Sequence, residues 1–306
     1  MTYDVLIIGG GAAGLSAAIT LSRARRRVLV VDGGRPRNAP ADGVHNYLGR
    51  EGTPPLELMA IGRGEVEHYG GEVVDGTVVA ITGTSGAFSA TLDSGATVTA
   101  RRVVVATGLR DELPELPGLA ARWGRDVIHC PYCHGWEVRD RVIGILGTGP
   151  GALHQAMLFR QWTDHVVLLE HRLPSIPEEQ RALLTARGVR IVPGEVTGLV
   201  VRDDAIVGAT VNGETVAIDA LTVAPRAHAR VDFLAPLGLV PVVDEMGSQL
   251  EHDAMGRTAV AGIRVAGSAG DVKAQVVVSA ADGLLVAAAL NAELIEEEFQ
   301  SALAKD

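Results

Sequence analysis

Two copies of one short glycine pattern constrain the fold of this chain more than any other feature of its sequence. The first copy, Gly9-x-Gly11-x-x-Gly14, follows the β-rich run Tyr3–Ile8 and precedes the Ala- and Leu-rich stretch Leu15–Arg23. In such a unit the first glycine makes the tight turn, the second lets a pyrophosphate approach the backbone, and the third lets the helix pack on the strand. The pattern therefore predicts a bound dinucleotide.

An acidic residue at the end of the next strand supports this interpretation. The apolar run Arg27–Val31 is predicted to form a second strand, and it ends at Asp32. A carboxylate at that position can accept hydrogen bonds from a ribose 2′-OH. We therefore place Gly9, Gly11, Gly14 and Asp32 in one candidate binding site.

A second unit of the same kind lies in the middle of the chain. The predicted strand Val142–Leu146 leads into Gly147-x-Gly149-x-x-Ala152, a helical stretch follows, and the strand after that stretch ends at Glu170. These residues form a candidate second nucleotide site. Two such units imply either two bound dinucleotides, or one dinucleotide and a second domain that is retained for its packing.

The composition suits an α/β protein of about two domains. The 306 residues are 47% hydrophobic, which is ample for packed cores, and 37 of them are glycine, as many tight strand-to-helix turns require. The formal net charge of −10 argues against a nucleic acid or an anionic membrane as a partner.

The sequence predicts neither a signal peptide nor a membrane span. Asp4 precedes the uncharged run Val5–Leu21, no basic region leads it, and glycines interrupt it. The apolar stretch Ala274–Leu290 is interrupted by Asp282. We therefore expect a soluble cytoplasmic protein with no membrane partner.

The two cysteines of the chain lie together in the motif Cys130-Pro131-Tyr132-Cys133. Two thiols at this spacing can close into a small disulfide and reopen, and a helix that begins at the first one favours its thiolate form. The alternatives are a pair of buried small hydrophobic residues or half of a zinc site. A tetrahedral zinc site needs four ligands and there is no second cysteine pair, so no metal site is predicted. In the cytoplasm such a pair is expected to cycle between dithiol and disulfide.

Over nearly its whole length, the chain resembles the low-molecular-weight thioredoxin reductases. The resemblance rests on Gly9–Gly14, Asn46-Tyr47-Leu48-Gly49, Ala106-Thr107-Gly108, Cys130–Cys133 and Ala266-Gly267-Ser268-Ala269-Gly270-Asp271, in this order. It implies two Rossmann-like dinucleotide-binding domains of three layers (ββα), the second inserted into the first. It also implies that residues 1–113 and 228–306 bind FAD, that residues 114–227 form an NAD(P)-binding-like domain with the cysteine pair, and that the protein is a homodimer.

The resemblance also implies roles for single residues. The positions that would bind FAD are Gly9, Gly11, Gly14, Asp32, Asn46, Asp271, Gln275 and Val276. Asp271 would contact the ribityl chain or a phosphate, whereas Gln275 and Val276 would lie beside the isoalloxazine ring. In this family the second cysteine faces the flavin and the first exchanges with substrate. Cys133 would therefore exchange electrons with FAD, and Cys130 would form the mixed disulfide with substrate.

One departure from that family concerns the proton. The reductases follow the second cysteine with an acidic residue, whereas this chain has His134. An imidazole with an ordinary pKa of about 6.5 can take a thiol proton near neutral pH, which suits a substrate that arrives as a dithiol. The alternative is a histidine that only caps or packs the helix.

A second departure concerns the pyridine nucleotide. The reductases bind the 2′-phosphate of NADPH through a cluster of basic residues after the strand of the second unit, and here that stretch begins with Glu170 and retains only Arg172 as a plausible partner. A glutamate would repel a 2′-phosphate. NADPH binding is therefore doubtful, while NADH binding through Glu170 and a domain that binds no nucleotide are both compatible with the sequence.

The run Cys-Pro-Tyr-Cys-His-Gly is similar to that of the gliotoxin and holomycin dithiol oxidases. This resemblance implies oxidation of a small-molecule dithiol to a disulfide, with Cys130, Cys133 and His134 as catalytic residues, FAD as cofactor, and oxygen as the final acceptor that becomes hydrogen peroxide. The alternative is a reductase that passes electrons from NADH or NADPH to thioredoxin or a related protein. A third reading is a non-catalytic flavoprotein whose disulfide reports redox state.

Overall fold

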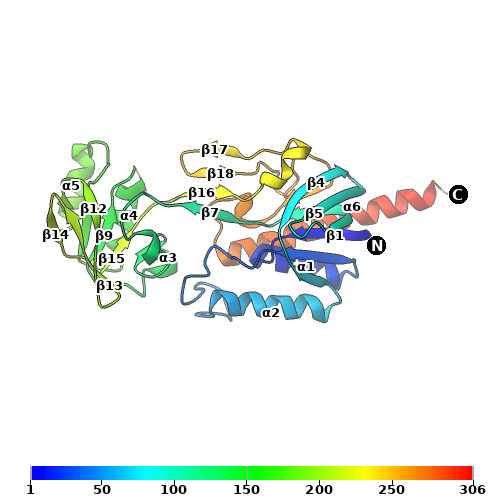
Figure 1. Cartoon of the computed structure of the whole chain (residues 1–306), viewed down its shortest axis with the longest axis horizontal. Coiled ribbons are helices and arrows are strands. Elements are labelled where there is room, and N and C mark those ends of the chain that lie inside the picture. Colours follow the sequence, from blue (N-terminus) through cyan, green and yellow to red (C-terminus); the bar gives the residue numbers. More distant parts are fainter. Residues whose placement is uncertain (1, 150, 305–306) are drawn as a thin grey trace. The chain divides into compact units, whose positions relative to one another are not determined.

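The computed structural model describes residues 2–149 and 151–304, and these form two compact units (Figure 1). Unit 1 contains Met1–Ala39, Thr53–Asp111 and Ala227–Asp306, and unit 2 contains Pro40–Gly52 and Glu112–Arg226. The chain thus leaves unit 1 twice, for the short segment 40–52 and for the long segment 112–226, and returns each time. Residues 40–52 cluster with unit 2, although the sequence analysis placed them in the first domain.

Unit 1 is built on a sheet whose central strands are parallel. The parallel part has the order β3-β2-β1-β6, and β19 also pairs with β6. The antiparallel strands β5 and β4 continue the sheet beyond β6. The strands are β1 (Thr2–Ile8), β2 (Val28–Asp32), β3 (Glu72–Asp75), β4 (Val78–Thr84), β5 (Ala87–Leu92), β6 (Thr97–Val105) and β19 (Ile263–Val265).

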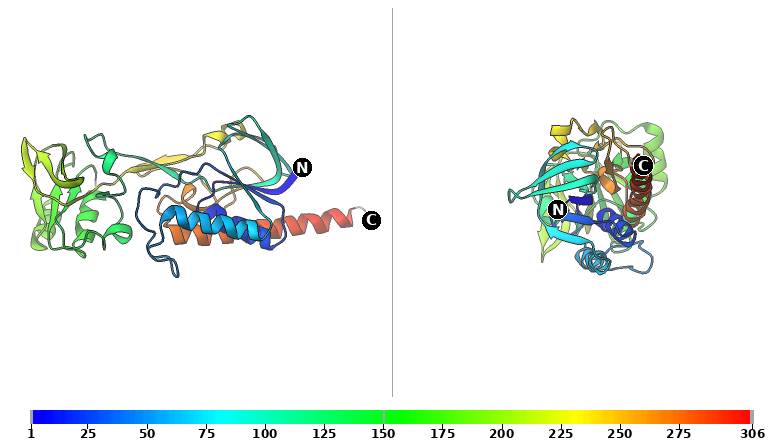
Figure 2. Two further views of the ribbon diagram at one scale, coloured as in Figure 1. Left: turned by 60° about the horizontal axis from the view of Figure 1, so that its bottom comes forward. Right: turned by 90° about the vertical axis from the view of Figure 1, so that its right-hand side faces the viewer.

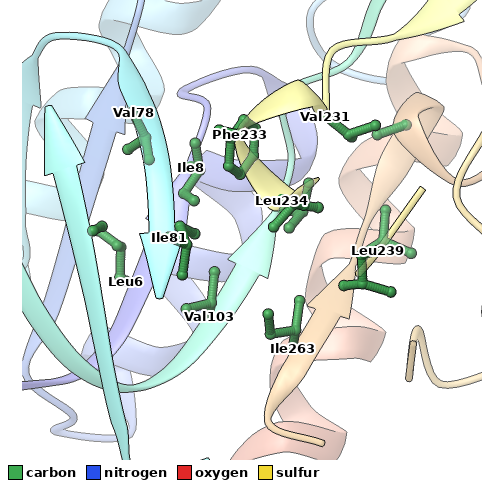
Figure 3. Close-up of a cluster of buried hydrophobic side chains, with 14 of the residues drawn as sticks. Leu6, Ile8, Val78, Ile81, Val103, Val231, Phe233, Leu234, Leu239 and Ile263 are labelled. Atoms are coloured by element: carbon green, nitrogen blue, oxygen red, sulfur yellow. The ribbon is translucent and has the colours of Figure 1, made fainter. Parts of the chain in front are cut away.

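Successive side chains of β1 point to opposite faces of the sheet, and this explains why unit 1 has three layers. Val5 and Ile7 join the cluster that packs against the helices, whereas Leu6 and Ile8 point to the opposite cluster. That opposite cluster contains Val78 and other residues of β4 and β5, together with apolar residues after the return of the chain (Figure 3). The order of layers is therefore β, β, α, as predicted.

Three helices cover the other face of the sheet. They are α1 (Ala12–Arg23), α2 (Pro55–His68) and α6 (Val276–Leu303), and α1 packs between the other two (Figure 2). The first helix begins at Ala12 and not at the predicted Leu15. Helices α1 and α6 approach very closely, because a Cβ atom on Gly283 would lie 2.1 Å from the carbonyl oxygen of Ala13.

Helix α6 is the one described helix that is long and apolar enough to cross a membrane by length and composition. The sequence analysis had treated Asp282 as an interruption of this stretch. In the structure the Asp282 carboxylate accepts a hydrogen bond of 2.6 Å from the Gly267 backbone N–H, and one face of α6 is buried against the core. A core helix of this kind passes the same test, so the finding is weak support for a membrane span.

Unit 2 repeats the layered plan on a smaller scale. Its parallel sheet has the order β11-β10-β9-β15-β8, and a separate antiparallel sheet has the order β12-β13-β14. Val166 and Leu168 of β10 face the helices, whereas Val167 and Leu169 face the second sheet. The elements are β8 (Val127–Ile128), α3 (Pro131–His134), β9 (Ile143–Leu146), α4 (Gly151–Phe159), β10 (Val166–Leu169), α5 (Glu178–Ala186), β11 (Arg190–Val192), β12 (Val196–Arg202), β13 (Ala205–Val211), β14 (Glu214–Val216) and β15 (Ala220–Thr222).

Two paired strands carry the chain between the units. They are β7 (Leu109–Glu112) and β16 (Arg226–Ala229), and a four-stranded sheet of order β17-β18-β16-β7 contains them. The other members are β17 (Val242–Asp244) and β18 (Gly247–Gln249), and short 3₁₀ turns occur at η1 (Ala120–Arg122), η2 (Asp232–Leu237) and η3 (Gly267–Ala269). The fold confirms the predicted α/β class with two Rossmann-like domains, the second inserted into the first.

Candidate functional site

The three glycines of the first loop have different surroundings. Gly9 has a φ of +105°, and a Cβ there would lie 2.3 Å from the Ala106 carbonyl oxygen. A Cβ on Gly14 would lie 1.9 Å from the Gly9 carbonyl oxygen. Gly9 and Gly14 are thus required by the packing of the protein itself. A Cβ on Gly11 would meet no atom within 4 Å, so the space beside this residue is open for a ligand group.

Asp32 is held in place by the backbone next to this loop. Its carboxylate accepts hydrogen bonds from the backbone N–H groups of Gly10, at 3.1 Å, and Gly34, at 3.2 Å. Arg63 of α2 lies 3.4 Å from the second oxygen of Asp32 and 2.5 Å from Asp75. These contacts fix the carboxylate at the carboxyl end of β2.

Strand register brings the remaining candidates of unit 1 to the same edge of the sheet. Ile8 pairs with Val105, and Val105 pairs with Val265, so the segments that follow these three strands emerge side by side. Asp271 is exposed, and its carboxylate accepts a hydrogen bond from the backbone N–H of Lys273. Gln275 is the N-cap of α6, and Val276 is its first residue. Ligands of open parallel sheets bind at this edge.

Thr107 is a further candidate that the sequence analysis quoted only within a motif. Its hydroxyl oxygen is buried, and it has no hydrogen-bond partner among the described residues. A buried hydroxyl without a partner costs free energy unless a ligand completes it. Together with the open space at Gly11 and the exposed first turn of α6, this suits the phosphates and polar groups of a dinucleotide such as FAD.

In unit 2 the cysteine motif follows β8 and includes the single helical turn α3. Cys130 is the N-cap of α3, and its carbonyl oxygen accepts hydrogen bonds from the backbone N–H groups of Cys133 and His134. Both cysteines are partly exposed. The predicted helix that begins at the first cysteine is thus a single turn of four residues, and a helix this short has a small dipole.

The helical turn packs against the aromatic ring of Trp162, which lies in the segment after α4. The ring of Tyr132 stands edge-on to the ring of Trp162, with 5.6 Å between centroids. A Cβ on Gly135 would lie 2.9 Å from the indole of Trp162. Glycine at this position of the motif is therefore required by packing.

His134 is partly buried immediately after the second cysteine. Its Nδ1 atom is buried and has no hydrogen-bond partner within the described part of the chain. Burial lowers the pKa of His134, the charge of Glu137 opposes this, and His45 and His129 lower the pKa further. A lowered pKa keeps the imidazole neutral, and hence able to accept a proton, at neutral pH.

The segment 40–52 places two side chains beside the cysteine motif. Asn46 donates a hydrogen bond of 2.8 Å to the carbonyl oxygen of Tyr132. His45 lies 2.7 Å from Glu51 and 3.4 Å from Glu137. Asn46 was predicted to contact the cofactor, and its side-chain hydrogen bond in this structure goes to the cysteine motif. The sequence analysis missed Glu51 and Glu137, although Glu137 follows His134 by one helical turn.

In the second glycine loop the first glycine is crowded and the second is open, as in the first loop, and the acidic residue is already paired. A Cβ on Gly147 would lie 2.4 Å from the Glu170 carbonyl oxygen, whereas a Cβ on Gly149 would meet no atom within 4 Å. Ala152 is buried in α4. The Glu170 carboxylate accepts a hydrogen bond of 2.7 Å from Arg181 of α5.

Arg172, the one basic residue predicted as a partner for a 2′-phosphate, also forms an ion pair. Arg172 lies 3.1 Å from Glu195, and both side chains are exposed. Exposed pairs of this kind are weak, so a phosphate can compete for the arginine. Glu170 and Arg172 thus both have protein partners, and the doubt about NADPH stays a prediction.

The predicted residues thus fall into two groups. Unit 1 contains Gly9, Gly11, Gly14, Asp32, Asp271, Gln275 and Val276, and unit 2 contains Asn46, Cys130, Cys133, His134, Gly147, Gly149, Ala152 and Glu170. Across residues 2–149 and 151–304, no group of three or more His, Cys, Asp or Glu side chains is arranged to hold a metal ion.

A cavity of about 480 Å³ in unit 1 contains none of these residues. Its charged side chains are paired with one another: Arg257 and Arg264 each lie 2.8 Å from Glu293, and Arg102 pairs with Glu297. These contacts connect the end of α6 to β6 and β19. We assign this cavity a structural role.

Comparison with known proteins gives consistent relatives. A family model described as pyridine nucleotide-disulphide oxidoreductase matches residues 3–283. The crystal structure of HlmI is 44% identical, covers 99% of this chain and 96% of its own, and superposes with a TM-score of 0.93. A thioredoxin reductase, sirT, of Leptosphaeria maculans is 29% identical over 94% of this chain and 93% of its own.

Some curated relatives match over a shorter segment. A probable thioredoxin reductase of Arthroderma benhamiae is 40% identical over 152 residues, which are 47% of this chain and 38% of that protein. The chain spans about half or less of the length of the first relatives it matches. Their activities and partners therefore enter only as support for a proposal.

Proposed function

The chain belongs to the pyridine nucleotide-disulphide oxidoreductase family of FAD-dependent enzymes, and from this premise we propose that it oxidises a small-molecule dithiol to a disulfide through Cys130 and Cys133. The observation that carries the proposal is His134. This partly buried imidazole directly follows Cys133, and burial lowers its pKa. A neutral base beside the cysteine pair suits a substrate that must lose thiol protons.

FAD is proposed to bind at the carboxyl edge of the unit 1 sheet. Gly11 leaves room for the pyrophosphate, Asp32 offers a fixed carboxylate to the ribose, and Thr107 offers a buried hydroxyl without a protein partner. Asp271, Gln275 and Val276 follow β19 at the same edge. When bound, FAD supplies two-electron redox chemistry, with oxygen as the final acceptor and hydrogen peroxide as the product.

The chemistry of the protein side chains is thiol–disulfide exchange. His134 accepts the proton of one substrate thiol, and the thiolate attacks the sulfur of Cys130 in the enzyme disulfide. The bond between Cys130 and Cys133 breaks, and Cys133 leaves as a thiolate. The second substrate thiol then loses its proton to solvent and attacks the first substrate sulfur, which forms the substrate disulfide and releases Cys130 as a thiolate. Two electrons have then passed from substrate to the cysteine pair.

The proposal extends to the setting of the enzyme. We infer a homodimer, as the resemblance to thioredoxin reductases implies, and a cytoplasmic location, as the sequence analysis expects. A reductase that delivers electrons from NADH to a thioredoxin-like protein is the second candidate. The feature that favours it is the open space at Gly149 in the second glycine loop. Against it, Arg181 already occupies the Glu170 carboxylate that a ribose would need.

The test uses the flavin-loaded protein and dithiothreitol as a model dithiol. In a sealed cuvette without oxygen, dithiothreitol should bleach the oxidised flavin band, and air should restore it with formation of hydrogen peroxide. NADH and NADPH, added separately, should bleach the flavin slowly or not at all. Rapid bleaching by either nicotinamide would favour the reductase.

Two matched variants complete the test. Cys130→Ser and Cys133→Ser should each lose oxygen uptake with dithiothreitol while they retain FAD. If either variant consumed oxygen as fast as the wild type, the cysteine pair would not carry the reaction and the proposal would fail.

A further inference from the structure

A buried amide side chain of α4 contacts the residue that precedes the cysteine motif. Gln155 is 6% exposed, and its Nε2 atom donates hydrogen bonds to the carbonyl oxygens of His129, at 3.1 Å, and Val223, at 3.3 Å. Its Oε1 atom accepts a hydrogen bond of 3.1 Å from the hydroxyl of Thr222, which is fully buried. Both N–H groups of the amide are thus used, and a flipped amide would place Oε1 against two carbonyl oxygens.

Strand pairing brings His129 and Val223 together. Thr222 of β15 pairs with Ile128 of β8 in parallel register, and the Val223 backbone N–H donates to the Ile128 carbonyl oxygen at 3.0 Å. His129 and Val223 therefore follow the two strands at the same level. The Nδ1 atom of His129 lies 3.0 Å from the Val223 carbonyl oxygen, so the sheet itself sets the position of this edge of the imidazole.

The contacts of Nδ1 decide which nitrogen of the His129 ring carries the proton. A carbonyl oxygen can only accept a hydrogen bond, so Nδ1 must donate to Val223, and the neutral ring is the Nδ1–H tautomer. The amide nitrogen of Gln155 also lies 3.3 Å from Nδ1, but its two N–H groups are used by the carbonyl oxygens. A lone pair on Nδ1 would face the lone pairs of the Val223 oxygen, which is repulsive. In the neutral ring the lone pair is therefore on Nε2.

We propose that Gln155 is a positioning residue that fixes His129 as the Nδ1–H tautomer, so that this imidazole exchanges protons only at Nε2. His129 is partly exposed and directly precedes Cys130. The inference rests on the proposed function for its use, because oxidation of a dithiol releases two thiol protons and His134 accepts one of them. The second proton passes from the substrate thiol to Nε2 of His129 and then to solvent. The sulfur keeps its electron pair, so this step moves one proton and no electrons.

Two substitutions separate this role from a contribution to stability. Gln155→Leu removes both amide N–H groups, so the imidazole is held by a single hydrogen bond. Because the Nε2–H form is the commoner neutral tautomer of free histidine, the ring in this variant should shift toward that form. Thr222→Val removes a buried hydrogen bond of the same network but leaves both amide N–H groups on their carbonyl oxygens. It should lower the Tm, as Gln155→Leu does, and leave the tautomer unchanged.

The measurement is an NMR spectrum of the FAD-bound protein labelled with ¹⁵N at the histidine rings, at about pH 8, where a histidine of ordinary pKa is neutral. Two-bond correlations between ring protons and nitrogens distinguish the nitrogen that carries a proton from the one that has a lone pair. The resonances of His129 are assigned as those missing in His129→Asn. If Gln155→Leu folds poorly, Gln155→Met replaces it, because methionine is unbranched like glutamine and also has no N–H group. Flavin absorbance verifies folding in each variant.

The wild type and Thr222→Val should have the proton on Nδ1, and Gln155→Leu should show a mixture of both tautomers. If the Nδ1–H share falls to about a third, dithiothreitol should bleach the flavin about threefold more slowly, with FAD still bound. An unchanged tautomer in Gln155→Leu, equal shifts in both variants, or a shifted tautomer with an unchanged bleaching rate would each overturn the inference. A wild type that dithiothreitol does not bleach at all would instead refute the proposed function, and the spectrum, which needs no substrate, would still decide whether Gln155 fixes the tautomer.

Discussion

The side-chain amide of Asn46 donates a hydrogen bond of 2.8 Å to the carbonyl oxygen of Tyr132, the residue between Pro131 and Cys133. Asn46 has a left-handed backbone with a φ of +60°, which asparagine tolerates better than most residues. One residue thus closes the loop of residues 40–52 against the redox motif through both its side chain and its backbone conformation.

Replacement of Asn46 should loosen this loop. Asn46→Ala removes the hydrogen bond and replaces asparagine by alanine, which tolerates the left-handed region less well, at a combined cost of about 1–2 kcal/mol. Amide hydrogen exchange over residues 40–52 should become faster, and this can be followed by mass spectrometry. The control is Asn46→Gly, which also lacks the hydrogen bond but tolerates the backbone conformation. An unchanged exchange rate in both variants would show that this hydrogen bond does not hold the loop.

The first glycine loop allows FAD binding and folding to be separated. Gly11→Ala adds a methyl group where no protein atom lies within 4 Å, so the fold should persist. FAD should bind at least about tenfold more weakly, which corresponds to about 1.4 kcal/mol, because the methyl group takes the space proposed for the pyrophosphate. The ratio of flavin absorbance to protein absorbance measures occupancy, and circular dichroism measures folding.

Gly14→Ala is the contrasting variant. Its Cβ would lie 1.9 Å from the Gly9 carbonyl oxygen, so the helix must move away from the strand. We expect loss of folded protein in this variant, seen as a lower Tm or insoluble expression. A Gly11→Ala protein that retained full FAD occupancy would contradict the proposed position of the cofactor.

Gly135 should not tolerate a side chain. A Cβ at this position would lie 2.4 Å from the Pro131 carbonyl oxygen and 2.9 Å from the indole of Trp162. Gly135→Ala should therefore destabilise unit 2 by about 1–3 kcal/mol, as overpacked cores do. The control is Gly149→Ala, where the added methyl group meets no atom within 4 Å. Thermal unfolding of the two variants, compared with the wild type, gives the difference in stability, and an equal Tm for both would contradict the predicted contact.

The pH dependence of dithiol oxidation should report the burial of His134. Burial is the largest cause that lowers the pKa of this residue. The rate with dithiothreitol should therefore persist as the pH falls through about 6.5, the ordinary histidine value, and should decline only at lower pH. His134→Gln should be slower at every pH and should lack this decline. A decline centred above 6.5 in the wild type would contradict the effect of burial.

The same pKa has a consequence for stability. The pKa of His134 is lower in the folded protein than in the unfolded chain. Between these two pKa values, the unfolded chain therefore binds more protons than the folded protein. The contribution of His134 is present above the unfolded pKa of about 6.5 and is lost as the pH falls through the folded pKa. Urea unfolding of wild type and His134→Gln can be compared between pH 7.5 and about 5. As the pH falls, the free energy of unfolding of the wild type should decrease relative to that of His134→Gln.

Local patterns in the sequence predicted most of the fold. Glycines at fixed spacing between a strand and a helix identify each nucleotide-type unit, because only glycine permits the turn at Gly9 and the close contact at Gly14. The apolar runs Tyr3–Ile8 and Val142–Leu146 predict strands, and the structure has strands at Thr2–Ile8 and Ile143–Leu146. The motif from Cys130 to His134 predicts a redox pair for the same reason, since its chemistry depends on near neighbours in the chain, and that role stays a prediction.

Contacts between distant segments could not be predicted in this way. Glu170 and Arg181 lie on different elements, and nothing in their spacing indicated that the arginine binds the carboxylate. The loop of residues 40–52 brings His45 to Glu137, far along the chain, and only the packing of the loop on unit 2 creates that pair. The sequence by itself thus determined the type of fold and predicted which groups react. The tertiary structure decided the charges around them, because the strength of an ion pair depends on distance in space and on burial.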